Sequence, residues 1–215
     1  MLTGGVALLT LSGCAGMHPG TAVKVGDTSI SRDQVDTISR IQCDLASGQQ
    51  QQGSQPRSKM VQATVNILIE SAIDNMYGDS VGASYDRAAL HTQVEQFKSG
   101  VAKLPSQDRD AIIKAFTDYA RGRLLIQGIG EQKLKEQGQQ KPGVDEAVNE
   151  GSQLAGRWAK KLDIQIDPRY NPGKSNQAGG GDGSISKSVS KYSRSAASAS
   201  SPTFVTTLPT GLRCG

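Results

Sequence analysis

The chain has 215 residues, of which 36% are hydrophobic, 20% are charged and only 4% are aromatic. A core with so few aromatic residues has to be built from Val, Ile, Leu and Ala, which favours packed helices over a β-sandwich. No apolar run reaches the roughly 18 residues that span a bilayer, which excludes a polytopic helical membrane protein. The length predicts one folded domain with additional segments rather than two enzyme domains.

The formal net charge of +4 is unevenly distributed. Residues 14–167 hold 18 Lys and Arg against 19 Asp and Glu, whereas residues 168–215 hold 6 basic residues against Asp182 alone. The excess charge therefore belongs to a tail, which suits contact with acidic polymers or anionic lipid. Proteins that bind single-stranded nucleic acid stack the bases on aromatic residues interleaved with basic ones. This chain lacks that pattern, so we expect no nucleic-acid partner.

The N-terminal 13 residues resemble the signal peptide of a bacterial lipoprotein. An apolar run, Val6 to Leu11, leads directly into Leu11-Ser12-Gly13-Cys14, which is similar to a lipobox. The resemblance implies cleavage before Cys14, a diacylglyceryl group on its sulfur, and a location on the extracytoplasmic face of the cell membrane. No Lys or Arg precedes the run to orient it, so we expect the true start codon to lie upstream. The alternative is a buried first strand with an incidental cysteine.

Export changes the interpretation of the other cysteines. With Cys14 assigned to lipid, Cys43 and Cys214 remain. An even number of cysteines in an oxidising compartment favours one disulfide, which would tie the C-terminus back to the domain. The alternative is two free thiols, one within a helix and one at the terminus.

The hydrophobic periodicity predicts a mainly α fold, a bundle of about five helices with a small β-hairpin. Residues 21–31 alternate like two short strands around a Gly26-Asp27 turn. Ser31 is placed to cap the first helix, with Gln34 three residues later as in a capping box. Residues 47–55, which are Gly, Ser and Gln only, are then expected to form a polar loop.

Four more helices, each with an apolar stripe, are expected over residues 56–77, 84–104, 106–140 and 144–162. Gly78 is expected to end the first of these, and Ser106 to cap the third. Gly128 and Gly130 are expected to weaken that third helix. Residues 163–167 alternate like a short strand, which we expect to pair with the first strand.

The composition changes after Asp167. Residues 171–201 are rich in Gly, Ser, Ala and Lys and show no apolar period, which is typical of low-complexity segments. These observations divide the chain into a signal peptide (1–13), a tether (14–20), a helical domain (21–167) and a basic tail that ends in a cysteine (168–215).

The sequence shows no enzymatic centre. Its two histidines, His18 and His91, do not form a metal site without carboxylates beside them, and we expect none. Residues 173–175 match the end of a P-loop but lack its first glycine and a following helix. Residues 128–130 lie inside an expected helix, where a dinucleotide turn does not occur. We therefore expect no catalytic residue, no cofactor and no enzyme activity.

Residues 21–167 resemble the N-terminal domain of SurA-type periplasmic chaperones and of their lipid-anchored foldase relatives. The similarity is carried by the valine-rich strand Ala22–Val25, the Gly26-Asp27 turn, Ile30, the helix opening Ser31–Asp36, and the long apolar helices and closing strand that follow. It implies a non-catalytic domain that holds unfolded exported polypeptides in apolar grooves and releases them without ATP. Foldases of this kind usually add a prolyl isomerase domain, for which the 48 mostly polar residues after Asp167 leave no room.

Five apolar residues on the expected helices, or beside them, are candidates for client contact: Met60, Val61, Tyr85, Phe97 and Trp158. The alternative interpretation makes each of them an ordinary core residue at helical spacing. Two other functions also remain open. One is a structural or envelope-associated lipoprotein that binds a specific partner, and the other is an accessory subunit of an enzyme.

Overall fold

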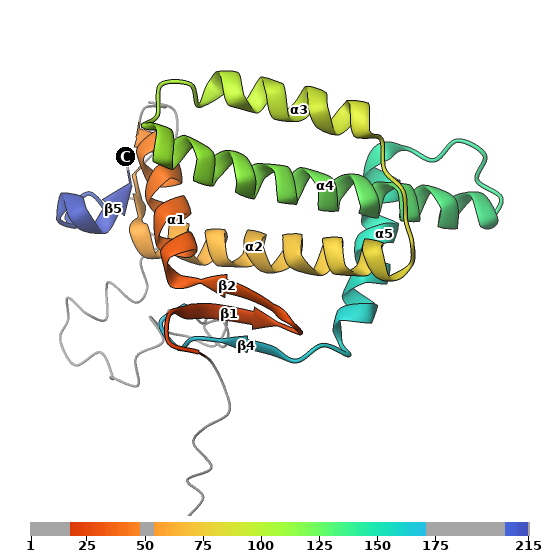
Figure 1. Cartoon of the computed structure of the whole chain (residues 1–215), viewed down its shortest axis with the longest axis horizontal. Coiled ribbons are helices and arrows are strands. Elements are labelled where there is room, and N and C mark those ends of the chain that lie inside the picture. Colours follow the sequence, from red (N-terminus) through yellow and green to blue (C-terminus); the bar gives the residue numbers. More distant parts are fainter. Residues whose placement is uncertain (1–17, 48–53, 171–204, 215) are drawn as a thin grey trace, which may run out of the picture.

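Five α-helices and a small antiparallel sheet form most of the computed structural model, which describes residues 18–47, 54–170 and 205–214 (Figure 1). The fold is mainly α, as the periodicity predicts. The helices are α1 (Arg32–Ser47), α2 (Arg57–Ser80), α3 (Arg87–Gly100), α4 (Ser106–Glu136) and α5 (Val144–Ala159). The strands are β1 (Thr21–Val25), β2 (Thr28–Ser31), β3 (Gln55–Pro56), β4 (Ile164–Ile166) and β5 (Arg213–Cys214), and a 3-10 turn spans Thr210–Leu212.

The three-stranded sheet has the order β2-β1-β4. β1 pairs with β2 through the expected two-residue turn, where Gly26 has a φ of 55°, a value that glycine adopts without strain. β1 also pairs antiparallel with β4, with Val23 opposite Ile166. The predicted pairing of the first strand with the strand after the last helix is therefore confirmed.

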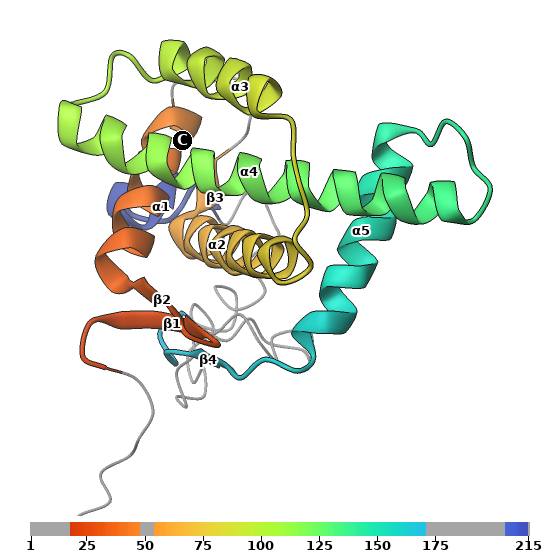
Figure 2. The ribbon, with the colours of Figure 1, turned by 45° about the vertical axis from the view of Figure 1, so that its right-hand side comes forward.

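The layers are visible in two views (Figures 1 and 2). α2 lies between the sheet on one side and α4 on the other, α3 forms an outer layer on α4, and α5 crosses the far end of the bundle. The core lies where β1, α1 and α2 meet, and its fully buried members include Val23, Val25, Val35, Ile41 and Val65. These are aliphatic residues, as the aromatic-poor composition requires.

One of the two predicted helix caps is present and the other is absent. The Ser31 hydroxyl accepts a hydrogen bond from the Gln34 N–H at 3.0 Å, as predicted for the start of α1. Ser106 does not cap α4: it is the first helical residue, Pro105 occupies the cap position, and the cap has no side-chain hydrogen bond. Proline suits the start of a helix because the first N–H groups have no partner within the helix, so its missing N–H costs no hydrogen bond.

Gly78 does not end α2 as predicted: the helix continues to Ser80. α4 contains Gly128 and Gly130, which were expected to weaken it, and extends to Glu136. A Cβ atom on Gly78 would lie 2.8 Å from Leu125 Cδ1 of α4. The glycine therefore permits close packing of two helices and does not end one.

The folded domain extends beyond Asp167. The Asp167 carboxylate pairs with Arg32 at 2.5 Å, and the buried Tyr170 hydroxyl donates a hydrogen bond to the Asp36 carboxylate at 2.9 Å. Burial and this hydrogen bond raise the pKa of Tyr170 to about 12, so the hydroxyl stays protonated. Residues 167–170 thus join the end of β4 to the first turns of α1.

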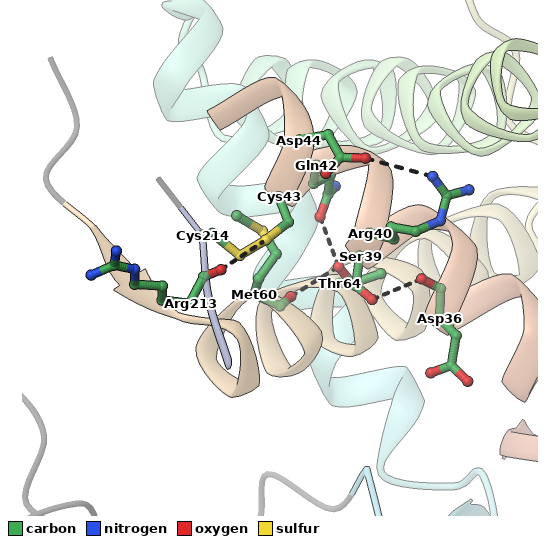
Figure 3. The surroundings of a disulfide bond; sticks show 10 residues. All are labelled: Asp36, Ser39, Arg40, Gln42, Cys43, Asp44, Met60, Thr64, Arg213 and Cys214. Carbon is green, nitrogen blue, oxygen red and sulfur yellow. Dashed lines mark hydrogen bonds and ion pairs between the residues drawn. A yellow bond between two sulfur atoms is a disulfide. The ribbon is translucent and has the colours of Figure 1, made fainter. Parts of the chain in front are cut away.

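The C-terminal residues 205–214 also pack on the domain. Cys43 of α1 and Cys214 of β5 form a disulfide with Cα atoms 4.9 Å apart (Figure 3). β5 pairs with β3, and Val205 and Cys214 are both buried. The two cysteines left after Cys14 are therefore adjacent in the fold. Their separation of 171 residues corresponds to about 5 kcal/mol in the loop-entropy account of disulfide stabilisation.

Candidate functional site

An open apolar groove of about 450 Å³ lies between α1, α3 and α4, and we call it the α3 groove. Its lining residues come from the end of α1, from one face of α3 and from the first half of α4: Leu45, Gln93, Gln96, Phe97, Gly100, Val101 and Phe116. The lining contains no charged residue. A concave apolar surface with a few amide groups suits an uncharged apolar or aromatic side chain.

Two stacked phenyl rings form the aromatic part of the groove. The rings of Phe97 and Phe116 are parallel within 4°, with centroids 4.0 Å apart, and both residues are half-buried. Their exposed parts face a space that the side chains of the described residues leave open. The groove therefore offers stacking surface to a ligand as well as general apolar contact.

The groove exists because α3 covers α4 incompletely. Leu90, Val94, Phe97 and Val101 follow at steps of four, three and four residues, so they form one stripe along the helix. Of these, Val101, just beyond the end of α3, is buried at 4% exposure, and the others are half-buried. The stripe is thus buried only beyond the C-terminal end of α3 and half-buried along the helix.

The five candidate residues do not come together. Phe97 alone among them lines the α3 groove. Met60 and Val61 lie in the first turns of α2. Met60 lies near the disulfide (Figure 3), and Val61 packs against the core. Trp158 contacts Tyr77, with ring centroids 5.7 Å apart, and Tyr85 lies under the Arg121 guanidinium at 5.5 Å.

The sequence pattern did not single out Leu45 or Phe116. Both lie on the apolar stripes of expected helices, and Leu45 also packs against the core. Their place in the groove depends on how the helices lie relative to one another, which no local pattern shows.

A polar joint connects α2 to α4. Arg121 of α4 bonds the Asn75 side-chain oxygen and pairs with Asp79 at 2.5 Å, while Arg123 pairs with Glu70 at 3.2 Å. Asp74 lies among these groups at 4% exposure, and its Oδ2 atom has no hydrogen-bond partner. Burial, with a smaller contribution from Glu70, raises the pKa of Asp74 to about 7.

Within the described residues, no three His, Cys, Asp or Glu side chains gather as a metal site requires. None of the helices in this part of the chain combines the length and the apolar character needed to cross a membrane. The predicted lipidation residue, Cys14, lies outside the described residues.

Comparisons with protein-family models, with curated proteins and with solved structures find no match to this chain.

Proposed function

We propose that this protein is a lipid-anchored, extracytoplasmic, chaperone-like protein that binds apolar segments of unfolded or partly folded exported polypeptides and catalyses no reaction. The observation that carries the proposal is the α3 groove, whose lining is apolar, aromatic and uncharged. Unfolded chains present apolar and aromatic side chains that this surface accepts without a specific sequence.

The size of the groove supports weak, reversible binding. Burying one large apolar side chain contributes about 1.5 to 3 kcal/mol, which is less than the roughly 4 kcal/mol or more that association costs. One groove therefore holds a client only with help from neighbouring contacts. A client that folds and buries its own apolar side chains is released without nucleotide hydrolysis.

We expect the purified protein to slow the aggregation of an unfolded client at near-stoichiometric ratio, without nucleotide. Phe97→Gln should reduce this effect severalfold, because it removes half of the aromatic stack and places a polar side chain in the groove. Light scattering from a chemically denatured client measures the effect, and circular dichroism verifies that the variant is folded.

Val144→Gln is the matched control for this measurement. Val144 is the first residue of α5, is 60% exposed and does not line the groove. The control should behave like the wild type. Equal loss in both variants would contradict a role for the groove. A protein that leaves aggregation unchanged but captures one native envelope partner would favour the structural alternative.

The proposed anchor has its own prediction. Growth with a clickable fatty acid should label the wild-type protein but not Cys14→Ser, because the lipobox resemblance implies that the Cys14 sulfur carries the lipid. Cys214→Ser is the control: it removes the disulfide partner at the other end of the chain and should keep the label. Equal labelling of wild type and Cys14→Ser would show that the anchor assignment is wrong.

A further inference from the structure

α3 is capped but poorly buried. None of its 14 residues is buried, whereas α5, with 16 residues, buries three. The Asp86 carboxylate caps α3 by accepting hydrogen bonds from the Ala88 and Ala89 N–H groups, at 2.8 and 3.0 Å. A helix of this length is only marginally stable in isolation. With so little buried surface, α3 is expected to separate from α4 and unfold locally at low free energy.

α3 is attached at its two ends and along its apolar stripe. Before the helix, Tyr85 packs under the Arg121 guanidinium, and after it Val101 is buried in the core. Between these points α3 rests on α4 as an outer layer (Figures 1 and 2), where Phe97 stacks on Phe116 and packs against the core. Displacing residues 86–100 therefore breaks this stack and the contacts of the half-buried stripe, but both end attachments lie outside the displaced segment.

We infer that α3 is a displaceable helix, and that the surface of α4 beneath it, around Phe116, accepts an amphipathic helix of a partner polypeptide in its place. This inference goes beyond the proposed function: it concerns the α4 surface that α3 covers, not the α3 groove, most of whose lining belongs to α3 itself. α3 occupies this surface in the structure and shows what the surface accepts. It carries apolar residues at steps of four, three and four, one of them aromatic and stacked on Phe116. Helices bind grooves through apolar side chains at this spacing.

Competition between α3 and the partner makes the inference testable. Because α3 is part of the same chain, a partner helix binds only the fraction of molecules in which α3 is displaced. Any change that weakens α3 without altering the α4 surface beneath it should therefore increase the affinity for an added helix. Asp86→Ala is such a change, since Asp86 caps α3 and is not among the groove residues.

The experiment uses a fluorescent synthetic peptide that copies residues 86–104 and the full chain of the protein. Fluorescence anisotropy should show binding to the wild type, and about fivefold tighter binding to Asp86→Ala, the factor expected from loss of one helix cap. The peptide carrying Phe97→Ser should lose binding at least tenfold. Asp145→Ala, which removes an exposed carboxylate from the first turn of α5, is the protein control and should bind like the wild type.

Hydrogen exchange supplies an independent measurement, in which α3 amides should exchange about a hundredfold faster than those of α4. Equal protection of α3 and α4, or equal peptide affinity of wild type and Asp86→Ala, would overturn the inference. If aggregation is still suppressed in that case, the proposed function stands without displacement of α3. If the peptide results are as expected but aggregation is unaffected, it is the proposed chaperone function that fails.

Discussion

Replacing Gly151 with alanine should destabilise the protein by about 3 kcal/mol or more, because the α4 and α5 backbones touch at this glycine. A Cβ atom at position 151 would lie 2.1 Å from the Ile126 carbonyl oxygen, and one at Gly130 would lie 1.8 Å from the Ala147 carbonyl oxygen. Both obstacles are backbone atoms, so no side-chain rotation relieves them and the helices have to separate. Gly130→Ala should have a comparable effect, and urea unfolding measures both.

Gly156→Ala is the matched control, since the same helix carries it and nothing lies within 4 Å of its added Cβ. This substitution should stabilise the protein by about 0.5 to 1 kcal/mol, the ordinary preference of a helix for alanine. If Gly151→Ala were stabilising by the same amount, the close approach of α4 and α5 would be contradicted.

Asp74 should make the stability of the bundle depend on pH. Its pKa is about 7 in the folded protein, against an ordinary value of 3.8, so the folded state binds more protons than the unfolded state between these values. The stability that the protonated carboxyl contributes is complete below about pH 4 and is lost as the pH rises through 7. A difference of about three pH units corresponds to about 4 kcal/mol.

Asp74→Asn keeps the shape of the side chain and removes the charge. The variant should be more stable than the wild type by up to about 4 kcal/mol at pH 8.5, and the difference should shrink to less than about 1 kcal/mol near pH 4. Urea unfolding across this range measures the difference. Asp145→Asn, on the exposed first turn of α5, is the control and should show no such trend. A pH-independent gain in Asp74→Asn would contradict the assignment of Asp74 as the titrating group.

The charges around Asp74 explain why it is not stabilised as an anion. Glu70 lies one helical turn earlier on the same helix and repels it, while Arg123 of α4, which attracts it, is paired with Glu70. Arg121, the next basic residue on α4, bonds Asn75 and Asp79. Both arginines that reach α2 from α4 are therefore paired with other groups. Neither fully offsets the free-energy cost of burying the Asp74 charge.

Features that depend on neighbouring residues or on composition could be predicted from the sequence. The cap of α1 by Ser31, the turn at Gly26 and the existence of five helices follow from local preferences and periodicity. The pairing of Cys43 with Cys214 was predictable as well, because the lipobox resemblance assigns Cys14 to lipid and leaves these two cysteines.

Which surfaces meet depends on the tertiary structure. Whether a helical glycine weakens a helix or permits two helices to cross depends on the backbone opposite it, such as the Ile126 oxygen that faces Gly151. The α3 groove likewise depends on how far α3 covers α4, so Phe97 was a candidate contact residue while its stacking partner Phe116 was not. Periodicity states which face of a helix is apolar, but the amount of that face left open is set by the size and position of the elements packed against it.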